Sequence, residues 1–164
     1  MAAKTLEDLF LDTLKDVYYA ERKILKTLPK MERAATAPEL KQAFNMHRQE
    51  TEGQVARLEQ VFEILGKRAQ GKTCAAIDGI TDEGAELIEE YGKSPAMDAA
   101  LTAVAQAVEH YEIARYGALR TWAETLGYSD AVSLLEETLD EEKAADEKLT
   151  EIAQTVNSTA MAAE

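Results

Sequence analysis

The chain has 164 residues, of which 46% are hydrophobic and 30% charged, so it has the size of about one domain and enough apolar content to fold. Glycine and proline are sparse, at 8 and 3 residues, which favours an all-helical chain. The formal net charge of −13 argues against nucleic acid and anionic membranes as partners, because both are negatively charged.

The sequence has no run of about 18 apolar residues, so we expect no transmembrane helix. Residues 1–5 lead into an amphipathic pattern without the apolar block of a signal peptide. Cys74 is the only cysteine, which excludes an internal disulfide and an iron–sulfur site built by this chain alone. We therefore expect a cytoplasmic protein in which Cys74 is a small, partly buried residue.

The first long helix is predicted over about 5–35. It starts after Thr5, and its apolar residues recur at helical spacing. Glu21 lies inside this apolar stripe and not beside it. Pro29 is expected to kink the helix or end it early, because an interior proline costs about 3 kcal/mol.

The second long helix is predicted over about 38–65, with Pro38 at its first position and Gly66 after its end. His47 and Gln54 lie on its apolar stripe, and Glu50 lies at the edge of the stripe between them. The short turn before Pro38 makes the first two helices antiparallel neighbours.

A long connection over 66–94 follows, with a short helix expected around 82–91. Connections of this length are uncommon in compact domains unless they cross the fold. In a four-helix bundle, one long crossover between the second and third long helices makes those two helices parallel.

The third and fourth long helices are predicted over about 95–126 and 129–156. Ser94 is expected to cap the third helix with Pro95 at its first position, and Gly127 to end it. Residues 157–164 are small and polar, and we expect them to be frayed. The whole chain, 1–164, is thus interpreted as one helical domain.

Each long helix carries a carboxylate near the midpoint of its apolar face. In a bundle of helices of similar length, these midpoints lie at one height, whichever way each helix runs. A buried carboxylate without a partner is costly, so it is normally protonated, paired or metal-bound. This pattern predicts a di-metal site in a ferritin-like bundle. The candidate ligands are Glu21, Glu50, Glu109, Glu112, Glu142 and Asp146.

The spacing within the last two helices suits two hard cations. Glu109 and Glu112 are three residues apart on one helical face, so one can bridge two ions while the other binds at the end. Glu142 and Asp146 have a comparable spacing of four residues. Carboxylate oxygens favour iron and manganese, and we expect two metal ions, iron first and manganese as the alternative.

Four motifs resemble the YciE/YciF family of stress-associated ferritin-like proteins, which are related to rubrerythrin. The motifs lie at 11–21, 47–51, 109–112 (Glu-His-Tyr-Glu) and 139–146. The resemblance implies an up-down-down-up four-helix bundle with a di-metal site, often a homodimer. By resemblance, Glu21, Glu50, Glu109, Glu112 and Glu142 match the carboxylate ligand positions.

The chain departs from the wider ferritin-like pattern, which has Glu-X-X-His on the second and fourth long helices. Here Gly53 and Ala145 occupy the two histidine positions. Gln54 and Asp146, one residue later, are candidates to fill the vacated space. His47 is a candidate ligand, a partner of a ligand or a core residue, while His110 is expected at the surface or an interface.

Three functions are compatible with these residues. The first is a di-iron or di-manganese protein that reacts with O2 or peroxide under stress and takes electrons from a separate donor. The second is Fe(II) oxidation or sequestration. The third is a non-enzymatic interaction protein with a vestigial metal site. Whether the protein is an enzyme, of peroxidase or ferroxidase type, is left open by the sequence.

Overall fold

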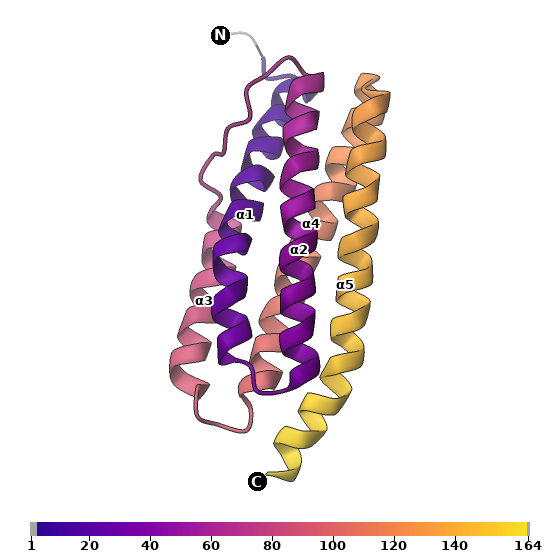
Figure 1. Ribbon diagram of the computed structural model, residues 1–164. Helices are drawn as coiled ribbons and strands as arrows, with labels where there is room; N and C mark the ends of the chain where they lie inside the picture. The colour runs from indigo at the N-terminus through magenta and orange to yellow at the C-terminus, as the bar shows by residue number, and fades with distance from the viewer. Residues whose placement is uncertain (1–2, 164) are drawn as a thin grey trace.

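The computed structural model describes residues 3–163, which form five α-helices and no strand. The all-helical prediction is confirmed. In Figure 1, α1 and α5 run in one direction along the molecule, and α2 and α4 run in the other. The five helices are α1 (Leu6–Ala34), α2 (Pro38–Ile64), α3 (Ala75–Tyr91), α4 (Met97–Leu126) and α5 (Ser129–Ala162).

Local sequence signals account for several helix ends. Thr5 caps α1: its hydroxyl accepts from the Asp8 amide at 3.1 Å, and the Asp8 carboxylate accepts from the Thr5 amide at 2.9 Å. Pro38 occupies the first turn of α2, where a missing N–H costs nothing. Gly127 ends α4 with a φ of +83°, a conformation that suits glycine.

The early end predicted at Pro29 is wrong, because α1 continues through this residue to Ala34. Leu28 and Met31, on either side of the proline, are both buried in one apolar cluster. Their packing outweighs the local cost of the proline.

Three other expected bounds also differ. The helix in the crossover begins at Ala75, earlier than expected. The helix α4 begins at Met97, because Ser94 caps a turn ahead of it and its hydroxyl accepts from the Ala96 amide at 3.0 Å. The helix α5 runs on to Ala162 in place of fraying after 156, since Val156 is buried and anchors its last turns.

The four long helices form a ring in which α1 packs on α2, α2 on α5, α5 on α4 and α4 on α1. The helix α3 lies outside this ring, against α4 and α1. Asp78 fixes α3 to α1: it accepts from the Tyr19 hydroxyl at 2.8 Å and pairs with the Lys23 ammonium at 3.1 Å. Among the described residues, none of the helices has the length and apolar character to cross a bilayer.

The apolar core is divided into two halves. One half contains Phe10 and Leu14 of α1, and the other contains Ile24 and Leu28, about three to five turns further along the same helix. Between them, at mid-bundle, lies a layer of buried polar side chains. The position of this layer agrees with the predicted height of the carboxylates.

A further buried carboxylate, that of Asp98, lies at the end of the bundle, apart from the mid-bundle layer. Asp98, in the first turn of α4, accepts from the amides of Thr36 and Ala37 at 2.8 Å each, and also from the Thr36 hydroxyl. Asp98 thereby holds the turn between α1 and α2 against α4.

Candidate metal centre

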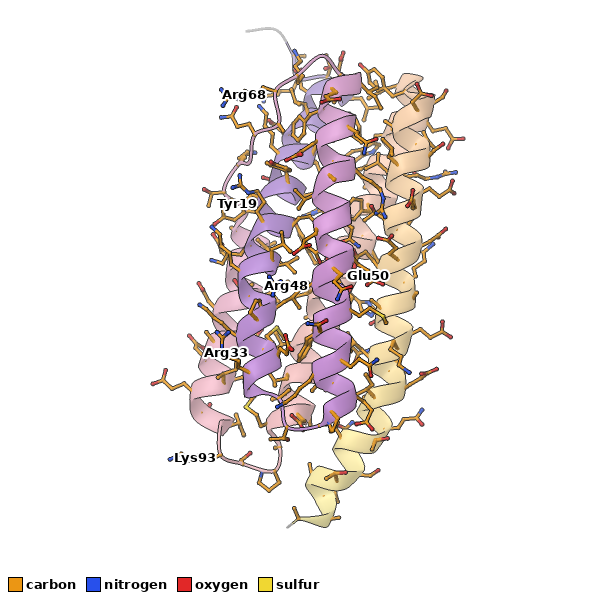
Figure 2. All side chains as sticks on the ribbon, viewed as in Figure 1. Tyr19, Arg33, Arg48, Glu50, Arg68 and Lys93 are labelled. Carbon is orange, nitrogen blue, oxygen red and sulfur yellow. The ribbon has the colours of Figure 1, made fainter. Side chains whose placement is uncertain are left out.

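All four helices of the ring contribute to the mid-bundle polar layer. Glu21, Glu112 and Glu142 are completely buried, and His47 and Glu109 are nearly so. Glu50 is the exception: its side chain is 35% exposed, and Figure 2 shows it near the middle of α2. We refer to Glu21, His47, Glu50, Glu109, Glu112 and Glu142 as the central cluster.

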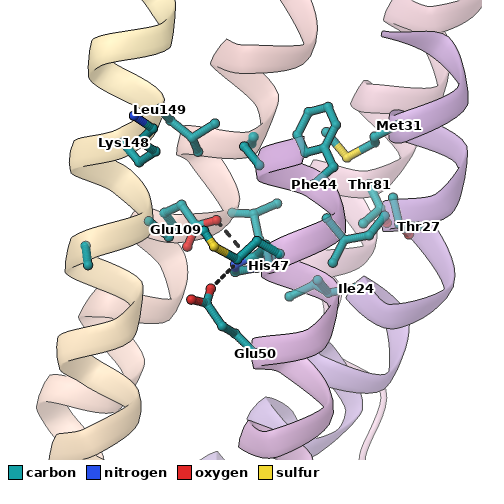
Figure 3. A pocket seen from close by; sticks show the side chains of 17 residues that line it. Ile24, Thr27, Met31, Phe44, His47, Glu50, Thr81, Glu109, Lys148 and Leu149 are labelled. Atoms are coloured by element: carbon teal, nitrogen blue, oxygen red, sulfur yellow. Dashed lines mark ion pairs between the residues drawn. The ribbon is translucent and has the colours of Figure 1, made fainter. Parts of the chain in front are cut away.

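Four members of the central cluster are close enough to hold one ion together. One ligand atom from each of His47, Glu109, Glu112 and Glu142 lies within 4.8 Å of the others. Both ring nitrogens of His47 face carboxylates: Nε2 is 3.5 Å from Glu109 Oε1 and 3.9 Å from Glu112 Oε2, while Nδ1 is 3.8 Å from Glu50 Oε2. These ion pairs are drawn in part in Figure 3.

Most polar atoms of this layer have no hydrogen-bond partner within the described part of the chain. The unpartnered atoms are Oε2 of Glu21, both ring nitrogens of His47, Oε1 of Gln54, Oε2 of Glu109, and both carboxylate oxygens of Glu112 and Glu142. Native proteins rarely leave buried polar atoms unpaired. The four residues His47, Glu109, Glu112 and Glu142 within this layer could therefore hold a metal ion.

Burial and mutual repulsion shift the titration of this layer. Burial, together with the charge of Glu142, raises the pKa of Glu21 to about 8. Burial also raises the pKa of Glu109 and of Glu112 well above the ordinary range, again with Glu142 adding to the shift. Burial lowers the pKa of His47, although the nearby carboxylates oppose this change. Without a cation, Glu21, Glu109, Glu112 and His47 therefore favour their neutral forms.

Tyr116 and Gln54 border the central cluster. The Tyr116 hydroxyl donates to Glu21 Oε1, and this bond lowers the pKa of Glu21 in opposition to burial. The Gln54 amide donates to Glu141 Oε2 at 3.0 Å, so its amide group is turned toward α5 while its carbonyl oxygen is unpartnered.

Arg57 and Glu141 are neighbours of the site that the sequence reasoning missed. Arg57 pairs with Glu141 and donates to Thr138 at 2.8 Å and to Glu137 at 3.0 Å. Arg57 follows Glu50 by seven residues, or about two helical turns. That spacing was the available signal for a basic residue on the same face.

The structure directs Asp146 away from the group of four. Its carboxylate is 3.1 Å from the His110 ring and accepts from Gln106 at 3.2 Å. His110 is exposed, as expected. The assignments of Asp146 and Gln54 as ligands therefore stay predictions, and Asp146 does not belong to the set of close ligand atoms.

The family model described as a domain of unknown function (DUF892) matches residues 5–162. The chain belongs to the DUF892 family. It is 48% identical to Protein YciF of Escherichia coli (strain K12) over 154 residues, which cover 93% of each chain. The expected resemblance to the YciE/YciF family is thus confirmed.

Solved structures show the same fold. The E. coli stress protein YciF matches with a TM-score of 0.90 and 46% identity over 95% of this chain and 99% of that one. YcfI from Rhodopseudomonas palustris matches with a TM-score of 0.87 and 51% identity over 90% and 94%. A Xanthomonas campestris protein, at 24% identity and a TM-score of 0.69 over 93% of each chain, shares the fold.

Proposed function

We propose that this DUF892 protein binds two ions of iron or manganese in the central cluster and serves in the response to oxidants. The observation that carries this proposal is the set of unpartnered, buried carboxylate oxygens contributed by α1, α4 and α5. The antiparallel and parallel helix directions of Figure 1 agree with a ferritin-like, up-down-down-up arrangement.

The charge of the layer fits two divalent ions. Glu21, Glu109, Glu112 and Glu142 are buried and carry four negative charges when ionised. Arg57 is the nearby basic residue, but it already pairs with Glu137 and Glu141. Two divalent cations supply the four positive charges that the described side chains do not.

The donor atoms favour hard cations. His47 is the one nitrogen ligand in the group of four, and the other three residues offer carboxylate oxygens. Carboxylate-rich sites suit iron and manganese, whereas structural zinc sites use cysteine and histidine. Bound ions of this kind would supply one-electron steps between divalent and trivalent states.

The surrounding residues prepare the site for such chemistry. Glu50 is half-exposed and faces His47, so it can carry a proton between solvent and the buried layer. Tyr116 orients Glu21 through its hydroxyl. The solved relative YciF is described as a stress protein, which supports a role under stress. We expect O2, peroxide or Fe(II) as the small-molecule partner, a separate electron donor if the protein turns over, and a homodimer.

Metal analysis tests the proposal. Protein purified from metal-replete cells, or reconstituted anaerobically with Fe(II), should contain about two ions per chain by elemental mass spectrometry. The double variant Glu112→Gln/Glu142→Gln should lose them, because both residues belong to the close group of ligands. The control Glu124→Gln/Glu147→Gln makes the same change at exposed positions of the same helices. Wild-type protein that stays empty after reconstitution favours the interaction protein without a working metal site.

A further inference from the structure

An apolar pocket opens beside the central cluster. It has a volume of about 210 Å³ and is lined by residues of α1, α2, α4 and α5 together with Thr81 of α3 (Figure 3). Met46 and Lys148, which are both exposed, lie on its solvent side. The side chains of Ile24, Leu28, Phe44, Val108 and Leu149 belong to its apolar wall.

The buried end of this pocket is formed by the metal candidates themselves. His47 and Glu109 line it, and Glu50 lines it next to them. Both ring nitrogens of His47 and the Oε2 atom of Glu109 have no hydrogen-bond partner in the described chain. Both side chains are more than nine-tenths buried. Unpartnered polar atoms therefore close an otherwise apolar pocket.

The size of the pocket suits one substituted ring. A cavity of about 150 Å³ lined by Leu, Ile and Phe binds benzene. A volume of about 210 Å³ therefore accommodates an aromatic ring, or a compact alkyl group, with a short polar head. Replacing water in this apolar pocket by such a ligand would be favourable, because it removes apolar surface of both the ligand and the pocket from water.

The polar end selects the head group. The carboxyl groups of Glu50 and Glu109 flank His47 at 3.8 Å and 3.5 Å, and among the described lining residues no cation lies at this end to pair with a carboxylate or phosphate head. A neutral hydroxyl or hydroperoxyl group can donate to these oxygens.

We propose that the apolar pocket binds a small neutral molecule with an apolar body the size of one substituted ring and a hydroxyl or hydroperoxyl head directed at His47 and Glu109. For the metal function proposed above, on which this step rests, the substrate class is then an organic hydroperoxide. Its reduction breaks the O–O bond, takes up two electrons and two protons, and leaves an alcohol and water. The electrons come from the separate reduced redox protein that the proposed function requires.

Binding to the metal-free, full-length protein tests the pocket directly. The probe is 4-fluorobenzyl alcohol, followed by 19F NMR. We expect saturable binding that is displaced by cumene hydroperoxide and not by hydrogen peroxide. Ala43→Leu, which adds a branched side chain to the pocket wall, should weaken the binding about tenfold. Ala56→Leu, at an exposed position of the same helix, should leave it unchanged.

A second pocket variant keeps the test decisive if Ala43→Leu does not fold. Ala145→Leu narrows the pocket from α5 and should weaken probe binding in the same way. No saturable binding by the wild-type protein, or equal binding by the wild type and a folded pocket variant, overturns the proposal.

Added Mn(II) separates the two proposals. Because Mn(II) is paramagnetic, an ion in the central cluster should broaden the 19F signal of a probe bound next to it. Mn(II) uptake without probe binding refutes the pocket and leaves the metal centre. Probe binding without uptake of Mn(II) or Fe(II) refutes the metal function and supports the pocket. Binding of both without broadening overturns the placement of the head group at the cluster.

Discussion

Asp98 and the carboxylates of the central cluster other than Glu50 are buried, but their oxygens have opposite surroundings. Asp98 accepts three hydrogen bonds from the turn between α1 and α2. Glu112 and Glu142 accept none at all in the described chain. Burial alone therefore does not distinguish a structural carboxylate from a ligand, whereas the count of unpartnered oxygens does.

Because of this difference in hydrogen bonding, Asp98 and the central carboxylates have opposite effects on the free energy of unfolding. The hydrogen bonds of Asp98 link α4 to a loop and stabilise the folded chain. The central carboxylates repel one another, and burial raises the pKa of Glu109 and Glu112. In the absence of a cation the central carboxylates oppose folding, and the proposed metal would offset this destabilisation.

The largest expected effect is stabilisation by metal. At a free metal concentration of about 1,000 times Kd, binding adds about 4 kcal/mol to the free energy of unfolding. For a domain of this size that raises Tm by about 10 °C. Differential scanning calorimetry with and without Mn(II) measures the shift. It should vanish in Glu112→Gln/Glu142→Gln and persist in Glu124→Gln/Glu147→Gln; an equal shift in both would refute the site.

Asp98→Ala should lower the free energy of unfolding by about 3 kcal/mol, because it leaves buried donors without an acceptor. Urea unfolding of the metal-free protein measures this loss. The matched control is Asp130→Ala, which changes an exposed residue in the first turn of α5 and should have little effect. Metal content should not change in folded Asp98→Ala, and its loss would contradict the separation of the two carboxylate sets.

Whether a feature of these carboxylates can be predicted from the sequence depends on how far apart in the sequence the interacting residues are. The period of apolar residues predicts the long helices, and their midpoints predict the height of Glu21, Glu109, Glu112 and Glu142. These features follow from helix geometry alone. The hydrogen bonds of Asp98 join residues 61 and 62 positions apart, and no local pattern reports them.

Asp146 shows the limit of spacing arguments at closer range. Four residues advance a helix by about 40° beyond a full turn. From Glu142 this rotation is enough to direct Asp146 toward His110 and Gln106 on α4. Pro29 shows the opposite case, since the packing of Leu28 and Met31 overrides a local signal that is usually strong. The apolar pocket is likewise lined by residues of five helices and has no sequence signature.

The pH dependence of the metal-free protein should report the central carboxylates. The pKa of Glu21 is raised from 4.5 to about 8, so the folded state holds this proton more tightly than the unfolded state. The resulting stability is complete below the unfolded pKa and is lost as pH rises through about 8. The free energy of unfolding should therefore increase by about 2 kcal/mol between about pH 7.5 and about pH 5.5.

Glu21→Gln provides the check on this pH effect, because an amide does not titrate. Chemical unfolding of the variant across the same pH range should give a flatter profile than the wild type. Bound metal should reverse the trend, since protons compete with the ion for the carboxylates. A metal-free wild type that loses stability on mild acidification would contradict the assignment of raised pKa values to this layer.

The smallest expected effect concerns Tyr116, which touches the central cluster without belonging to it. Its hydroxyl donates to Glu21 Oε1 and lowers the pKa of that carboxyl. Tyr116→Phe should therefore raise the pKa of Glu21 further and cost about 1 kcal/mol of stability. Because metal requires the ionised carboxylate, affinity for Mn(II) near neutral pH should fall about tenfold.

Tyr18→Phe is the matched control for this last change. The Tyr18 hydroxyl donates to Glu59 at 2.9 Å, a carboxylate outside the central cluster. Calorimetric titration with Mn(II) should separate the two variants, whereas a simple loss of packing would affect both alike. Equal Mn(II) affinity in the two variants would show that Tyr116 contributes to packing and not to metal binding. Only the ligand residues themselves would then distinguish the central carboxylates from the peripheral ones.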